Sequence, residues 1–133
     1  MKIEKQIDNI YYKNLNLEHL EEMYNIIRKT CKNRSKVFYF SLNKNTNLLR
    51  IYEQLYNKTY KPSKYTIFTI FEPKPRLVMS QTIEDKIVNH FITKYYLLPY
   101  LENKLIDSNV ATRKEKGSKH FPFTTFYSLH LYP

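Results

Sequence analysis

Apolar residues recur every three or four positions in three stretches of the chain, which is the spacing of one face of an α-helix. The first stretch predicts an amphipathic helix of about four turns over residues 17–31, whose acidic start and basic end suit the helix dipole. The second predicts a helix over residues 47–57. The third predicts a helix that starts at Thr82, with Asp85 in a variant of the capping box, and that Pro99 kinks or ends.

An extended pattern separates the second and third predicted helices. Every residue from 65 to 71 is aromatic or β-branched, and residues 76–80 form a second short apolar run. The two runs predict a β-hairpin, and the prolines between them stiffen a turn that holds Lys74 and Arg76 close together at its tip. The chain is therefore predicted to be α+β, a mainly helical subdomain with one β-hairpin at about 65–80 between helices.

The composition narrows the class of protein. The 133 residues fit one domain, and 22 Lys+Arg against 12 Asp+Glu give a net charge of +10, which favours a polyanionic partner, nucleic acid ahead of an anionic membrane surface. The single glycine, Gly117, excludes dinucleotide-binding and P-loop folds, which need several glycines near phosphate. Cys31 is predicted to be a buried thiol without a disulfide partner. With no apolar signal stretch or membrane-spanning run, we expect a cytoplasmic protein with no membrane segment.

The residues suited to chemistry are cations rather than catalytic groups. The four histidines share no metal-ligand spacing, and no two carboxylates stand together on an apolar strand, so no catalytic residue and no metal ligand is predicted. Two groups of cations suit phosphates, namely the Lys74/Arg76 pair and a basic loop containing Arg113, Lys114, Lys116 and Lys119. Each group is also compatible with an ordinary solvated turn, because exposed loops tolerate charge.

Two blocks of sequence, in this order, resemble the fingers region of bacterial reverse transcriptases of the group II intron and retron type. Residues 70–79 (IFEPKPRLVM) and 82–90 (TIEDKIVNH) resemble that family's strand, Lys-Pro turn with Arg, second strand and following helix. Lys86 stands where the family usually has Arg. Residues 98–102 (LPYLE) resemble the segment at the end of that helix. Residues 109–118 (NVATRKEKGS) resemble the next block, which usually has an aromatic-Ala-x-Arg-x-x-Lys-Gly-Thr-His pattern, with Val110, Lys116 and Gly117 in matching places.

The resemblance covers about residues 45–120 and implies a division of the chain into three regions. Residues 1–63 would be an N-terminal helical extension of the kind that contacts template RNA. Residues 64–120 would be the fingers, made of the β-hairpin, a helix and the basic loop. Residues 121–133 would be an atypical apolar tail, because they match no part of the family's continuation.

The resemblance also implies roles for the cations in a complete enzyme. Lys74 and Arg76 at the fingers tip would bind the triphosphate of an incoming nucleotide and offset charge on the leaving pyrophosphate. Contacts with the RNA template and DNA primer would come from a second set: Lys86, Arg113, Lys114, Lys116 and Lys119. The chain itself is expected to hold no cofactor, because the Mg²⁺ of the complete enzyme would be bound by the palm. We therefore expect a fragment of an RNA-directed DNA polymerase that lacks the catalytic palm and is inactive alone.

Two other functions are compatible with the same sequence. The first is a stand-alone basic RNA-binding module without catalysis, in which the loop cations do the whole work. The second is an interaction protein that dimerises through residues 121–133, since residues 120–133 contain no charged side chain. That segment is expected to be either an unselected, out-of-frame extension or an added strand that packs on the fingers.

Overall fold

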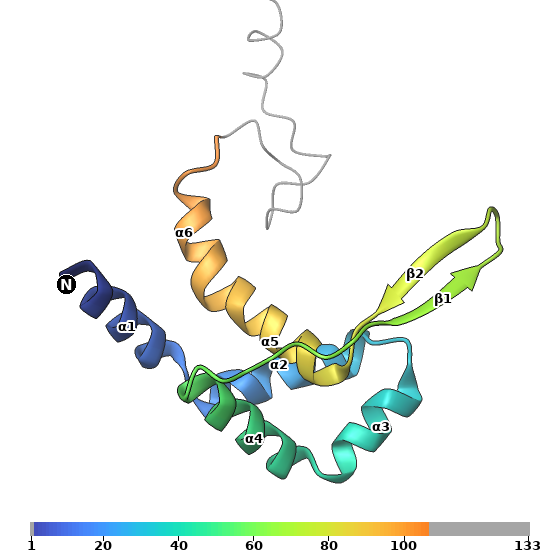
Figure 1. Ribbon diagram of the computed structural model, residues 1–133, viewed down its shortest axis with the longest axis horizontal. Coiled ribbons are helices and arrows are strands. Elements are labelled where there is room, and N and C mark those ends of the chain that lie inside the picture. Colours follow the sequence, from blue (N-terminus) through green and yellow to red (C-terminus); the bar gives the residue numbers. More distant parts are fainter. Residues whose placement is uncertain (1, 107–133) are drawn as a thin grey trace, which may run out of the picture. The chain divides into compact units, whose positions relative to one another are not determined.

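The computed structural model describes residues 2–106, in two compact units that meet between Leu97 and Leu98. The helices of the first unit are α1 (Lys2–Asn14), α2 (Leu17–Thr30), α3 (Arg34–Leu42), α4 (Lys44–Tyr56) and α5 (Ile83–Ile92), followed by the π-helical turn η1 (Thr93–Leu97). Along the chain, strands β1 (Thr66–Ile70) and β2 (Arg76–Ser80) follow α4 and precede α5, and they form a hairpin (Figure 1). In the second unit, the short helix α6 (Leu98–Glu102) is described. The predicted α+β class, mainly helical with one hairpin, is confirmed.

Side-chain caps set the starts of three helices. The Asn16 side chain accepts a hydrogen bond from the backbone N–H of His19 at 2.7 Å and begins α2. The Asn33 side chain does the same for Lys36 at 3.2 Å and begins α3. The predicted cap of α5 is confirmed, because the Thr82 hydroxyl accepts from the N–H of Asp85 at 3.2 Å.

The core lies where α2, α4 and α5 pack against one another, with α3 against α4 and α5. The apolar stripe predicted for α2 faces this core, and Leu20 and Ile27 are almost completely buried. The largest fully buried side chains are Phe91, Leu20, Met23, Ile27, Ile51 and Ile87. Cys31 lies at the edge of the core and is buried, as the pattern predicted.

Helix α1 is attached by tyrosines and not by an apolar face, since none of its residues is buried. The hydroxyl of Tyr11 donates to the carbonyl of Leu55 at 2.6 Å, and the hydroxyl of Tyr96 donates to the carbonyl of Tyr11 at 2.7 Å. The rings of Tyr11 and Tyr96 also stack, with centroids 5.7 Å apart. Neither α1 nor α3 was predicted from the sequence.

Helix α5 ends at Ile92, earlier than the predicted break at Pro99, and its backbone continues through η1. Pro99 lies in the first turn of α6, where a missing N–H costs little. A proline ring clashes with the carbonyl four residues before it, here that of Tyr95 inside η1. The π-helical turn η1 comes just before α6 and Pro99 in the sequence, and such turns are common where a proline interrupts a helix.

Candidate nucleic-acid interface

The hairpin carries the first pair of predicted site residues. β1 and β2 are antiparallel, and their register pairs Thr66 with Ser80 at one end and Ile70 with Arg76 at the other. Lys74 lies in the turn between the strands, which contains a cis peptide bond before Pro73. Every residue of β1 is exposed, so the hairpin extends from the helices with its turn at the far end (Figure 1). Within residues 2–106, neither Lys74 nor Arg76 pairs with a carboxylate, so both charges are available to a ligand.

A buried carboxylate holds the near end of the hairpin. Asp85 is only 4% exposed and accepts hydrogen bonds from the Tyr60 hydroxyl and from the backbone N–H of Ser63, at 3.1 Å to Oδ2. Burial and this hydrogen bond raise the pKa of Tyr60 well above its usual range. Tyr60 and Ser63 precede β1, whereas Asp85 follows β2 in the first turn of α5. The carboxylate therefore ties the chain entering the hairpin to the helix that leaves it.

The base of the hairpin is also fixed to α3. The ammonium of Lys36 donates to the hydroxyl of Ser80 at 3.0 Å and lies 3.5 Å from the carbonyl oxygen of Gln81. The sequence pattern predicted Asp85 only as a helix-start residue and gave Lys36 no role. The contacts of Asp85 and of Lys36 each join residues more than 20 positions apart in the sequence, so the spacing of apolar residues could not predict them.

Lys86, the third predicted site residue, lies at the base of the hairpin and not at its tip. Its side chain is half-buried, and its ammonium donates to Sγ of Cys31 at 3.4 Å. The two residues line a pocket of about 450 Å³ together with His90. Because a strand of five residues spans about 16 Å, the structure separates Lys86 from Lys74 along the hairpin. Lys86 thus lies near the helices at the base of the hairpin, and not near Lys74 at its turn.

A third basic region was missed by the sequence reasoning. Residues 28–36 (RKTCKNRSK) contain five cations and no carboxylate, and this density was the available signal. The segment joins the end of α2 to the start of α3 beside the hairpin base. The guanidinium of Arg34 donates to the carbonyl of Arg28 at 2.7 Å, which satisfies a free carbonyl near the end of α2. Among residues 2–106, no cation of this segment forms an ion pair with a carboxylate.

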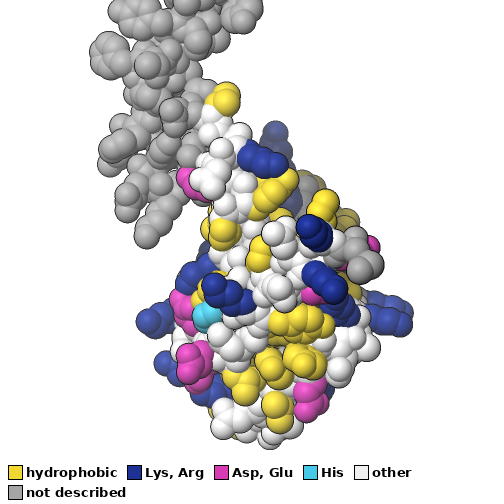
Figure 2. Space-filling view, turned by 90° about the vertical axis from the view of Figure 1, so that its left-hand side faces the viewer, with side chains coloured by type: hydrophobic (Ala, Val, Ile, Leu, Met, Phe, Trp, Pro, Cys, Tyr) yellow, Lys and Arg dark blue, Asp and Glu magenta, His cyan; other side chains and the backbone are white. Residues whose placement is uncertain are grey.

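Four other cations are paired with nearby acids. The described ion pairs are Lys44–Glu21, Arg50–Glu84, Lys58–Asp8 and Lys94–Glu22. On the face shown in Figure 2, Lys and Arg side chains are spread among hydrophobic and acidic ones. The hairpin turn and residues 28–36 are two places where cations without a described ion pair are close together in the sequence.

The remaining predicted cations and the apolar tail lie outside the described residues: Arg113, Lys114, Lys116, Lys119 and residues 121–133. Within residues 2–106, no three His, Cys, Asp or Glu side chains converge on a point that could hold a metal ion. None of the described helices is long and apolar enough to cross a membrane.

Comparison of the sequence with models of known protein families gives no match, and comparison with curated proteins gives none either.

Proposed function

We propose that the chain is the fingers region of an RNA-directed DNA polymerase, which contributes contacts to the template-primer and to the incoming nucleotide while the catalytic carboxylates lie in a palm that these 133 residues do not include. The observation that carries the proposal is the anchored hairpin. Its base is fixed by Asp85 and Lys36, and its turn presents Lys74 and Arg76 without acidic partners in residues 2–106. This is the order of strand, Lys-Pro turn, strand and helix on which the resemblance rests.

The two cations at the turn have complementary chemistry. The planar guanidinium of Arg76 can donate two parallel hydrogen bonds to phosphate oxygens, whereas the ammonium of Lys74 acts as a compact charge. A triphosphate gains negative charge on its leaving pyrophosphate during nucleotidyl transfer, so cations held in place beforehand would stabilise that change. A hairpin fixed at its base keeps the turn in position for this task.

The nucleic-acid half of the proposal is tested by measuring affinity for a labelled RNA template–DNA primer duplex over a range of salt concentrations. Affinity should fall as salt rises, because phosphate contacts release counterions. Arg113→Ala and Lys116→Ala should each reduce the slope of log affinity against log salt by about one. Lys94→Ala, whose ammonium is paired with Glu22 and which is not among the predicted contact residues, is the matched control and should leave the slope unchanged. Absence of binding at low salt, or binding indifferent to salt, would contradict the proposal.

The basic segment 28–36 favours a second candidate, a stand-alone RNA-binding module. Its cations need no palm and no triphosphate in order to contact a phosphate backbone. The two candidates differ in what they gain from a polymerase palm. A chimera with the palm of a related reverse transcriptase should regain DNA synthesis only if the chain is a fingers region.

A further inference from the structure

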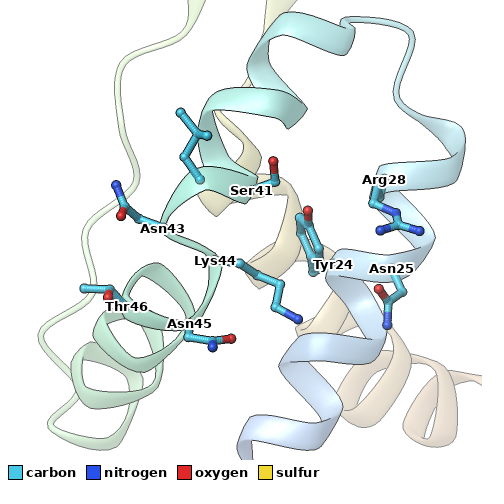
Figure 3. A pocket seen from close by; sticks show the side chains of 9 residues that line it. Tyr24, Asn25, Arg28, Ser41, Asn43, Lys44, Asn45 and Thr46 are labelled. Carbon is cyan, nitrogen blue, oxygen red and sulfur yellow. The ribbon is translucent and has the colours of Figure 1, made fainter.

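A polar pocket lies between α2 and the corner where α3 meets α4, away from the hairpin residues of the proposed function. It has a volume of about 520 Å³, and Figure 3 shows side chains from α2 on one side of it and side chains from the α3–α4 corner on the other. Tyr24, Asn25 and Arg28 come from α2, and Ser41 and Lys44 come from the corner. No carboxylate lines it. A pocket rich in donors and cations is suited to an anion.

The hydroxyl of Tyr24 is the first donor at this pocket. Tyr24 is 2% exposed, and its ring stacks on Phe40 with centroids 5.3 Å apart. Among residues 2–106, its hydroxyl has no hydrogen-bond partner, whereas Tyr11, Tyr60 and Tyr96 all have one. The hydroxyl lies at the pocket beside Ser41 (Figure 3). Because no side-chain oxygen or nitrogen of the described residues is both buried and without a partner, this hydroxyl is accessible from the pocket and is free to donate to a ligand oxygen there.

The start of α4 provides a second set of donors. Asn43 precedes the helix without a side-chain capping bond, and the first backbone N–H bond within α4 runs from Asn47 to Asn43, at 2.9 Å. The N–H groups of Lys44, Asn45 and Thr46 therefore have no partner among the described residues, and all three residues line the pocket. The N-terminus of a 13-residue helix with free N–H groups attracts negative charge.

The cations complete the arrangement. The Arg28 guanidinium forms no described ion pair, so its fork of donors is free. The Lys44 ammonium is paired with Glu21 at 2.6 Å, which reduces its pull on an anion but leaves it further N–H donors. Ser41 already donates to the carbonyl of Phe38 at 2.6 Å and adds no free donor. A guanidinium, helix N–H groups and a tyrosine hydroxyl around one cavity match the several acceptor oxygens of a phosphate.

We propose that the pocket formed by Tyr24, Arg28 and the first turn of α4 binds a phosphate group. The group is either free phosphate or the phosphodiester of a single-stranded RNA backbone. Both present non-bridging phosphate oxygens to the same donors. The pocket shares no residue with the hairpin on which the polymerase proposal rests.

The test is an NMR titration of the full chain with inorganic phosphate. Added phosphate replaces chloride in the buffer, so that the ionic strength stays constant. The backbone amides of Asn45 and Thr46 should shift and saturate. Arg28→Gln should weaken binding by about tenfold or more, because it removes a charge-assisted donor from an exposed side chain without touching the core. Tyr24→Phe keeps the stacked ring and should weaken binding by about fivefold through loss of one hydrogen bond.

Lys64→Gln is the matched control, since it removes the same charge from an exposed residue outside the pocket. It should change the affinity by less than about twofold. A second titration uses a short oligouridylate with hydroxyl ends. If it shifts the same amides and phosphate displaces it, the source is an RNA backbone; if only inorganic phosphate shifts them, the source is free phosphate. An absence of saturable shifts with both probes, or equal weakening by Arg28→Gln and Lys64→Gln, would overturn the proposal.

Discussion

Replacement of Asp85 by alanine should loosen the base of the hairpin. The carboxylate accepts from the Tyr60 hydroxyl and the Ser63 N–H, and both of these donors belong to the segment that leads into β1. Without it, the two donors lose their acceptor inside a site that is only 4% exposed at Asp85. The chain entering the hairpin then has no polar tie to α5 at this point.

The expected loss of stability follows from these two bonds. A hydrogen bond to a charged group contributes about 1.5–3 kcal/mol, and we use the lower value because Tyr60 is half-buried and Ser63 is exposed. Two such bonds give about 3 kcal/mol for Asp85→Ala, or a drop of about 12 °C in the melting temperature of a unit of this size. Tyr60→Phe removes one bond and should cost about half as much.

Thermal and urea unfolding followed by circular dichroism measure these losses, and amide hydrogen exchange reports on the hairpin. Asp85→Ala should speed exchange at Ser63 and in β1 more than in α2. Glu84→Gln is the matched control: it changes the neighbouring carboxylate, whose ion pair with Arg50 is partly exposed and should contribute less than about 1 kcal/mol. Equal destabilisation by Asp85→Ala and Glu84→Gln would refute the reasoning.

Three further predictions concern the core and the pH limits of stability. Phe91→Ala should cost about 3–5 kcal/mol in urea unfolding because Phe91 is fully buried, whereas Phe71→Ala, at 73% exposed, should cost less than about 0.5 kcal/mol. Burial raises the pKa of Tyr96 to about 12, so stability should fall as pH rises from about 10 to 12, and Tyr96→Phe should flatten that fall in thermal unfolding. Hydrogen bonds from Lys94 and Tyr95 lower the pKa of Glu22, so Glu22→Gln should remove less than about 1 kcal/mol at neutral pH and progressively less below pH about 4, a difference that unfolding at the two pH values would show.

The elements that the sequence predicted correctly are those with a local signal. The apolar stripe of α2 and the β-branched runs of the hairpin are written into consecutive residues, and so is the pairing of Thr82 with Asp85. Helix α4 begins at Lys44, three residues before the predicted start, because its first turn is polar and adds nothing to the apolar pattern.

Helices α1 and α3 were not predicted, for two different reasons. Helix α3 buries Val37 and Phe40 but exposes Phe38 and Tyr39, so its apolar residues do not mark one face. Helix α1 does repeat apolar residues, yet Ile3 and Ile7 are exposed, and the helix is attached through tyrosine hydroxyls. Neither kind of attachment follows from binary patterning.

The candidate site was predicted where its residues are neighbours in sequence and missed where the fold joins distant ones. Lys74 and Arg76 share one short turn, so the pair could be seen in the sequence. The contact of Lys86 with Cys31 spans 55 positions, and that of Tyr60 with Asp85 spans 25. The pocket between α2 and the start of α4 is formed by residues far apart in the sequence, so the sequence alone could not predict it.

The most direct test of the fingers proposal is primer extension by a chimera of this chain with the palm and thumb of a group II intron or retron reverse transcriptase. The chimera should extend a DNA primer on an RNA template, and Arg76→Ala should raise its KM for the nucleoside triphosphates by about tenfold. Lys64→Ala, just before the hairpin, is the control and should leave KM unchanged. A folded chimera that binds the primed template but makes no product, or equal effects of Arg76→Ala and Lys64→Ala on KM, would contradict the account.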